Sequence, residues 1–250
     1  MKTLCVLLPA YNEERSIGAM IVKILRLDIP KMSIVALVVD DGSRDQTARL
    51  AREAGAQVLS HGANRGVGAA FRTGLEWARE NHFDFLAHID ADGQHRPEDI
   101  VRLIEPVAQG KADLAIGSRF LGAPPENLAR WKSVSLQSLS RGVGRLTGCR
   151  LSDISCGLRC MNQRIMEKVV PTFDYDYIQE SLLQAMAARA RIMEIPVPVS
   201  YPAGPHSGRG PIETLRYILN SLALTAYALL EFFWKKTSRE SAVDVTPADC

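Results

Sequence analysis

Short apolar runs and longer amphipathic segments alternate along the first half of the chain. The short runs are rich in Val, Ile and Leu, which is typical of buried strands. The longer segments carry apolar residues at helical spacing, and within residues 12–27 Ile17, Ile21 and Ile24 share one face. This alternation predicts βαβ units, a mostly parallel sheet and the α/β class. The predicted strands cover residues 3–9, 33–41, 56–61, 83–90 and 112–120.

Polar residues end three of these predicted strands. Ligands of parallel α/β sheets bind at the carboxyl ends of the strands, where the strand order reverses. We therefore expect the three polar sets to meet at one edge and to form a single site. The sets are Pro9-Ala10-Tyr11-Asn12-Glu13, Asp40-Asp41-Gly42-Ser43 and Asp90-Ala91-Asp92.

The third set has the composition of a metal site. Asp90 and Asp92 stand two positions apart, so their side chains point the same way while the strand lasts. Together with Gln94 they offer the oxygen ligands that Mg²⁺ or Mn²⁺ prefers. Mg²⁺ held by one or two carboxylates completes its shell with water and substrate phosphates, which indicates a diphosphate substrate. The alternative is a polar turn whose aspartates cap a helix.

Further polar residues suit a nucleotide. Asp40 or Asp41 can accept hydrogen bonds from a ribose hydroxyl or a base N–H, Tyr11 can cover a base, and Glu13 can accept from a ribose hydroxyl. Arg119 can pair with a phosphate in a bidentate manner. Each has an ordinary alternative as a cap, a turn residue or a surface ion pair.

Composition narrows the classes of function. With 250 residues and 46% hydrophobic residues, the chain can bury a large core. A net charge of +2 does not favour nucleic acid as a partner. The run before Pro9 is read as a first strand and not as a targeting segment. The cysteines lack metal or disulfide spacing, which favours reduced thiols in a cytosolic protein; they are Cys5, Cys149, Cys156, Cys160 and Cys250.

Two amphipathic stretches follow in the second half. Residues 126–148 combine an apolar helical face with Arg130, Lys132, Arg141 and Arg145, so this helix either lies on an anionic membrane or packs on its own domain. The other stretch is apolar from Tyr217 to Trp234, but it carries polar residues and is marginal for a membrane span. We expect it to be interfacial or packed. The expected organisation is a domain over 1–210, this helix over 211–236 and a disordered polar tail over 237–250.

Several sequence motifs, taken together, resemble those of one enzyme family. The segments LLPAYNEERSI, VVDDGSRDQT, NRGVGAAFRTGL, HIDADGQHRPEDI, IGSRF and DISCGLRCMNQR stand in the order found in family 2 glycosyltransferases. Over roughly residues 3–200, the chain most resembles the dolichyl- or polyprenyl-phosphate hexose synthases of that family. The resemblance implies a GT-A fold, a UDP- or GDP-hexose donor and Mg²⁺ or Mn²⁺.

The resemblance also implies roles for single residues. Asp90, Asp92 and Gln94 would carry the metal, and Asp92 and Arg119 would serve the transfer step. Arg209 stands where the family has a phosphate-binding lysine, whereas Ala203 lies near the place of an expected arginine. The set implied to bind the nucleotide sugar is Pro9, Tyr11, Glu13, Asp40, Asp41, Asp90, Ala91, Asp92, Arg119 and Arg209.

The implied reaction is a single displacement that inverts the anomeric carbon. A lipid phosphate is ionised at neutral pH and needs no general base, whereas a sugar hydroxyl needs one. Asp153 and Glu180 are the candidate bases. A polyprenyl-phosphate acceptor implies a cytoplasmic protein, peripheral on the membrane. The alternatives are a transferase with a glycan or other soluble acceptor, a non-catalytic nucleotide-binding protein and, less favoured because no lysine-bearing phosphate loop is present, a nucleotidyltransferase.

Overall fold

The computed structural model describes residues 1–122, 125, 127–174 and 176–199, together with helical positions scattered between 212 and 227. Arg209, Ala203 and the expected tail over 237–250 lie outside the described residues. The described strands are β1 (Lys2–Ala10), β2 (Met32–Asp40), β3 (Gln57–Ser60), β4 (Phe85–His88), β5 (Leu114–Ser118), β6 (Arg159–Asn162) and β7 (Ile192–Pro196). The described helices are α1 (Ile17–Leu25), α2 (Thr47–Glu53), α3 (Val67–Glu80), α4 (Asp99–Ala108), α5 (Arg130–Thr147), α6 (Gln163–Met166) and α7 (Tyr177–Ala187).

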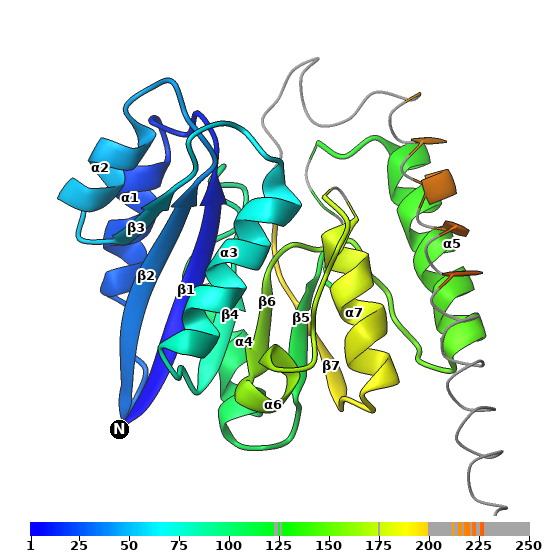
Figure 1. Ribbon diagram of the computed structural model, residues 1–250. Coiled ribbons are helices and arrows are strands. Elements are labelled where there is room, and N and C mark those ends of the chain that lie inside the picture. The colour runs from blue at the N-terminus through cyan, green and yellow to red at the C-terminus, as the bar shows by residue number, and fades with distance from the viewer. Residues whose placement is uncertain are drawn as a thin grey trace, which may run out of the picture.

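The seven strands of the described part form one sheet in the order β3-β2-β1-β4-β6-β5-β7. Every neighbouring pair is parallel except the two that involve β6, which is antiparallel to both β4 and β5. In Figure 1, α3 and α7 lie in front of the sheet and α1 and α4 behind it. The prediction of a mostly parallel α/β sheet is therefore confirmed, and the five predicted strands correspond to β1 to β5.

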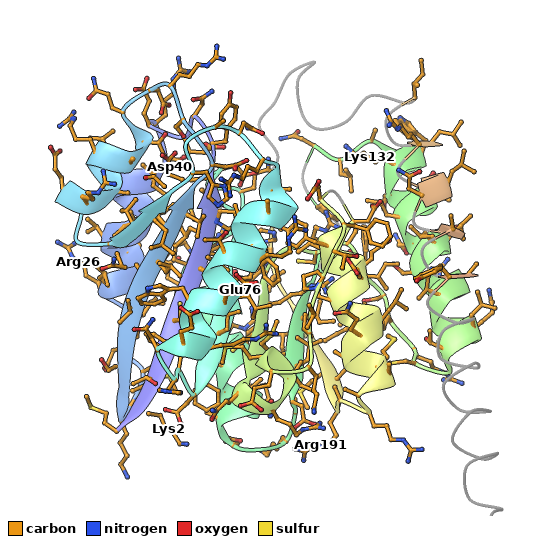
Figure 2. The ribbon with its side chains drawn as sticks, viewed as in Figure 1. Lys2, Arg26, Asp40, Glu76, Lys132 and Arg191 are labelled. Atoms are coloured by element: carbon orange, nitrogen blue, oxygen red, sulfur yellow. The ribbon has the colours of Figure 1, made fainter. Side chains whose placement is uncertain are left out.

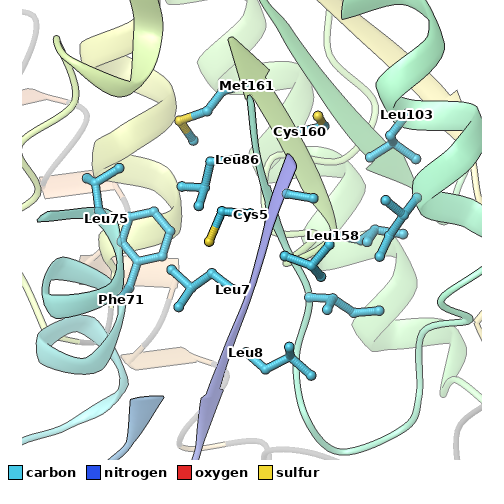
Figure 3. Packing of buried hydrophobic residues seen from close by; sticks show 14 of the residues in the cluster. Cys5, Leu7, Leu8, Phe71, Leu75, Leu86, Leu103, Leu158, Cys160 and Met161 are labelled. Atoms are coloured by element: carbon cyan, nitrogen blue, oxygen red, sulfur yellow. The ribbon is translucent and has the colours of Figure 1, made fainter. Parts of the chain in front are cut away.

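The core lies on both faces of the central strands, because strands covered by helices on both sides must be apolar throughout. Cys5 and Leu7 of β1 and Leu86 of β4 are fully buried, and Figure 3 shows them beside Phe71 and Leu75 of α3. These contacts fix α3 against β1, and with it the loop that precedes α3.

The basic amphipathic helix predicted over 126–148 corresponds to α5. Leu139 and Val143 are buried, and Gly144 lies so close to the backbone of Cys149 that a Cβ atom would clash with the Cys149 carbonyl. One face of α5 thus packs on its own domain, while Trp131 and Val134 are exposed. None of the helices described is both long and apolar enough for a membrane crossing.

Candidate active site

The sheet order brings the three polar strand ends together. β1 lies between β2 and β4 and is parallel to both. Ala10 is the register partner of Asp40, and Leu7 is the partner of His88, so the loops after these strands leave from the same edge. In Figure 2, Asp40 lies at the upper end of the molecule and Lys2, where β1 begins, lies at the lower end. The three strand ends thus share one edge of the sheet, as predicted.

Asp90 sits two residues beyond β4 and is half-buried, with its carboxylate directly against Gly157. A Cβ atom on Gly157 would clash with Asp90 Oδ2, so the absence of a side chain there lets the carboxylate reach its position. Asp92 lies in the turn that follows, where the Gln94 backbone N–H donates to Asp92 Oδ1 at 2.9 Å. The turn contains Gly93 with a φ of 77°, a conformation that favours glycine.

The carboxylates at this edge influence one another. The pKa of Asp92 is raised to about 6, first by desolvation of its carboxyl within the loop and then by the negative charges of Asp90 and Glu13, although the residue keeps an exposed surface. The pKa of Glu13 is also raised, first by burial and further by Asp45 and Asp90. Three acids therefore share one region with too little positive charge, and a bound cation would relieve their repulsion.

The donor set suits a hard divalent cation. Within the described ranges, no three His, Cys, Asp or Glu side chains converge as a complete metal centre. Two carboxylates, Asp90 and Asp92, with the amide of Gln94 nearby, match a magnesium-like site that takes its remaining ligands from water and phosphate. The residues present thus fit the metal that the sequence implied.

Ser16 connects the first and third polar sets. Its hydroxyl donates to the Ala91 carbonyl at 2.7 Å and lies 3.1 Å from Glu13 Oε2. Ser16 immediately precedes α1, so the start of this helix is fixed to the loop that carries Asp90 and Asp92. Pro9 is buried in β1, whereas Tyr11 is 41% exposed and available to a ligand.

The two adjacent acids after β2 have different surroundings. Asp40 Oδ1 accepts from the Ser43 backbone N–H at 3.1 Å. Both acids are buried, but the oxygens of Asp41 accept from His61 Nδ1 at 2.7 Å and from the backbone N–H groups of Arg65 and Gly66 at 2.9 and 2.8 Å. Asp41 therefore holds the loop before α3, and Asp40 is the acid with fewer protein partners.

Arg119 lies just beyond β5 and forms a bidentate ion pair with Asp153. Its Nε and Nη2 atoms donate to the two Asp153 oxygens at 2.6 and 2.7 Å, and Nη2 also donates to Ser155 Oγ at 2.6 Å. Asp153 is fully buried, and although burial raises its pKa, Arg119 outweighs this and leaves the pKa below its usual value. The alternative of an ion pair is realised, but with a buried partner and not at the surface.

Neither candidate base is poised to take a proton. Asp153 is occupied by Arg119, as described. Glu180 is buried, and its oxygens accept from the backbone N–H groups of Thr172 and Phe173 at 2.7 and 2.9 Å and from the Thr172 hydroxyl at 2.9 Å. Both carboxylates serve to shape loops.

Two further residues lie in this region and were not predicted from the sequence, Gly157 and His95. Gly157 belongs to the segment DISCGLRCMNQR, but its contact with Asp90 depends on the antiparallel placement of β6. His95 directly follows Gln94 and is buried, and its Nε2 lies 3.9 Å from Cys156 Sγ. Burial lowers the pKa of His95, so the neutral imidazole is favoured. The proximity of His95 to the predicted metal ligands in the sequence was the available signal.

A mostly parallel sheet with acids at its carboxyl edge suits one class of enzyme, the glycosyltransferases. The model of the family described as "Glycosyl transferase family 2" matches residues 5–170, and the chain belongs to this family. The match covers all three polar strand ends and the Arg119–Asp153 pair.

Characterised relatives sharpen the comparison. The chain is 32% identical over 203 residues to the polyprenol monophosphomannose synthase of Mycolicibacterium smegmatis. The alignment covers 77% of this chain and 75% of the relative. It is 30% identical over 205 residues to the undecaprenyl-phosphate mannosyltransferase of Micrococcus luteus, over 76% of this chain and 81% of the relative. The resemblance to polyprenyl-phosphate sugar transferases is thus confirmed.

A solved structure shows the same fold at lower identity. Glucosyl-3-phosphoglycerate synthase from Mycobacterium tuberculosis, in complex with Mn²⁺, UDP-glucose and phosphoglyceric acid, superposes with a TM-score of 0.70 at 20% identity and covers 91% of this chain and 80% of that one. The predicted GT-A fold is confirmed.

Proposed function

We propose that this glycosyltransferase moves a hexose from UDP or GDP to a polyprenyl phosphate, with inversion at the anomeric carbon and with Mg²⁺ or Mn²⁺. The observation that carries the proposal is the gathering of Asp90, Asp92 and Glu13 at the carboxyl edge of the sheet. The acceptor class is supported by the relatives, which are named for polyprenol monophosphomannose synthesis and undecaprenyl-phosphate mannosyl transfer.

The donor would lie across the ends of β1, β2 and β4. We expect Tyr11 and Asp40 to meet the base and ribose: Tyr11 is exposed, and Asp40, although buried, has one backbone partner. Asp90, Asp92 and Gln94 would hold the cation, as a solved structure of the same fold contains Mn²⁺ with UDP-glucose. When bound, the cation supplies positive charge that offsets the charge developing on the leaving diphosphate.

The proposed reaction is a displacement at the anomeric carbon by the acceptor phosphate. An oxygen of the acceptor phosphate forms the new bond to the anomeric carbon while the bond to the nucleoside diphosphate breaks. No proton has to leave the acceptor, which agrees with the full occupation of Asp153 and Glu180 by other partners. The charge of Arg119 is offset by Asp153, so we expect Arg119 to position a phosphate by directed N–H groups more than by net charge. Arg209 stays a candidate phosphate contact outside the described residues.

We propose further that the protein is peripheral on the cytoplasmic membrane face. Trp131 and Val134 are 46% and 62% exposed on α5, next to Arg130 and Lys132, a combination that suits the interface of an anionic bilayer. Sedimentation with anionic liposomes at low salt tests this, and protein left wholly in the supernatant would remove the idea.

The transfer is tested by screening UDP- and GDP-hexoses with a short polyprenyl phosphate, with 3-phosphoglycerate as the soluble acceptor, in Mg²⁺ or Mn²⁺. We expect release of nucleoside diphosphate only with the lipid phosphate. Asp92→Asn should lower turnover by about 100-fold or more, as expected for loss of an electrostatic contact to the transition state. Glu98→Gln, an exposed acid six positions away, is the matched control and should retain activity. Undiminished turnover in Asp92→Asn would remove the metal assignment, and faster transfer to 3-phosphoglycerate would remove the lipid acceptor.

A further inference from the structure

Two polar side chains are buried in β4 and β6, just before the acidic edge, and neither has a role in the reaction proposed above. His88 of β4 is 1% exposed and Arg159 of β6 is 2% exposed, and the two are register partners in this antiparallel pair of strands. Continuing the register by two residues places Asp90 opposite Gly157, which agrees with the close approach of the Asp90 carboxylate to Gly157. Burying a polar group is costly unless it forms hydrogen bonds, so the partners of both side chains indicate what they do.

The ring of His88 is bonded at both nitrogens. Nδ1 lies 2.6 Å from the Gly157 carbonyl oxygen, and Nε2 lies 3.2 Å from the Tyr177 hydroxyl. A carbonyl oxygen can only accept, so Nδ1 carries the hydrogen. Burial lowers the pKa of His88, which favours the neutral ring, and Nε2 of that ring accepts from Tyr177. Phe71 packs edge-on against the imidazole, with ring centroids 5.3 Å apart, and this contact holds the ring in its orientation.

Arg159 holds the same stretch of chain as His88. Its guanidinium donates to the carbonyls of Ile154 and Cys156 at 2.6 and 3.0 Å. With the bond from His88, three carbonyls of the loop before β6, residues 153–157, therefore accept from buried side chains. The path of this loop is thus set by groups in the interior of the protein.

The loop before β6 contacts two groups that the proposed reaction uses. At one end of the loop, Gly157 lies against the Asp90 carboxylate. Toward the other end, Asp153 and Ser155 accept from the Arg119 guanidinium. A shift of the loop would therefore displace the predicted metal ligand, the arginine or both.

We propose that His88 is a positioning residue for Asp90 and acts on it through Gly157. The bond from Nδ1 fixes the Gly157 carbonyl, and with it the surface against which the Asp90 carboxylate lies. The inference rests on the proposed function, because it takes Asp90 as a ligand of the cation. Without the bond, the Gly157 carbonyl would turn toward another donor, and Asp90 would lose its support.

Replacement of His88 by amides separates the two ends of the ring. The amide nitrogen of asparagine is as many bonds from Cα as Nδ1, so His88→Asn keeps a donor for Gly157. The amide of glutamine is as many bonds from Cα as Nε2, so His88→Gln can meet Tyr177 but leaves Gly157 without its donor. Tyr177→Phe is the matched control, because it removes the partner of Nε2 and keeps the bond to Gly157.

Calorimetric titration with UDP and with GDP, each with and without Mn²⁺, measures how much the cation raises the affinity for the nucleotide. We expect His88→Gln to lose about tenfold or more of this gain, as when a supporting contact of a metal ligand is removed. Its affinity for the nucleotide without Mn²⁺ should stay unchanged, since the bond acts on the metal ligand alone. His88→Asn and Tyr177→Phe should keep the gain, and thermal unfolding checks that each variant is folded at the temperature of the titration.

The outcomes separate this inference from the proposed function. If Mn²⁺ does not raise the nucleotide affinity of the unaltered protein, the metal assignment is wrong and the inference falls with it. If Mn²⁺ raises the affinity of the unaltered protein and of folded His88→Gln equally, only the inference is overturned. The same holds if folded His88→Asn loses as much of the gain as His88→Gln. Should His88→Gln not fold, His88→Leu takes its place, because it also removes the donor and suits a buried strand.

Discussion

At the scale of the residue, Gly157 decides how the strand-ending carboxylate Asp90 is placed. Gly157 precedes β6, which runs antiparallel beside β4, and the Asp90 carboxylate lies against its Cα atom. Its φ is outside the left-handed region, so an alanine there would not strain the backbone. The added Cβ would instead push the Asp90 side chain away from its place.

Gly157→Ala should therefore impair the reaction more than the fold. We expect transfer to fall by about tenfold, comparable to losses when a supporting contact of a metal ligand is changed, and the concentration of Mn²⁺ giving half-maximal activity to rise. Gly142→Ala is the control, because nothing lies within 4 Å of a Cβ atom at that position of α5. Transfer kinetics at varied Mn²⁺ concentration measure the effect on the reaction, and thermal unfolding measures the effect on the fold. An unchanged Mn²⁺ dependence in Gly157→Ala would contradict the assignment of Asp90 as a metal ligand.

The residue scale also shows what sequence can predict about the site. Asp90, Asp92 and Glu13 were found because strand ends in a parallel sheet share an edge, a rule that needs only local patterns. The different roles of Asp40 and Asp41 were not separable, since the partners of Asp41 include His61 and two backbone groups of a distant loop. Local patterns do not reveal which of two adjacent acids faces the protein.

At the scale of the element, the start of α3 is fixed by a close contact of backbones. Gly68 is the second residue of α3, and its N–H donates to the Asp174 carbonyl at 2.9 Å. A Cβ atom on Gly68 would clash with the backbone at Phe173 and Asp174. Arg72, one turn later, donates to the Thr172 carbonyl at 3.0 Å and to the Asp174 carboxylate at 2.7 Å. The N-R-G-V-G motif thus joins α3 to the loop before α7.

Gly68→Ala should destabilise the protein by about 1–3 kcal/mol, the range for forcing extra atoms into a packed site. Backbone atoms cannot swing aside as a side chain can, so α3 must shift as a unit. Gly18→Ala is matched, because Gly18 is also the second residue of its helix and a Cβ atom there meets nothing within 4 Å. Urea unfolding of both variants measures the difference in stability. Equal midpoints for Gly68→Ala and Gly18→Ala would show that the contact of Gly68 with the backbone at Phe173 and Asp174 is not tight.

The strands of the first half were predicted, including the four-residue strands β3 and β4, whereas β6 and β7 of the second half were not. β6 has four residues and contains Arg159, a charged residue that the pattern of a buried strand does not predict, although its side chain is only 2% exposed. Its guanidinium donates to the carbonyls of Ile154, Cys156 and Ile178 at 2.6, 3.0 and 2.6 Å, partners supplied by the tertiary fold. Tertiary contacts thus override the sequence pattern here, and with β6 the single reversal of strand direction went unpredicted.

At the scale of the whole molecule, Asp113 joins three elements at the end of the sheet opposite the acidic edge. It accepts from Arg191 Nε and Nη2 at 3.0 and 2.9 Å, from Arg164 Nη2 at 2.9 Å and from Asn162 Nδ2 at 2.9 Å. Figure 2 shows Arg191 at the lower end of the molecule, far from Asp40. The hydrogen bonds from Arg191, above all, hold the pKa of Asp113 well below its usual range.

This gives a pH dependence of defined sign. A carboxyl with a lowered pKa in the folded state stabilises above the unfolded pKa of about 3.9, and the stabilisation is lost as the pH falls toward the folded value. Asp113→Asn should therefore lower the free energy of unfolding by on the order of 2 kcal/mol at pH 7, and the difference from the unaltered protein should shrink below about pH 5. Asp28→Asn, at an exposed acid, should change the free energy of unfolding little at any pH.

Denaturant unfolding of the variants from pH 7 to pH 3 measures this pH dependence. A difference between Asp113→Asn and the unaltered protein that grew on acidification would show that the charge of Asp113 does not stabilise the fold. Since Asp113 lies far from the strand ends that carry Asp90 and Asp92, metal-dependent transfer at neutral pH should persist in Asp113→Asn wherever the protein remains folded.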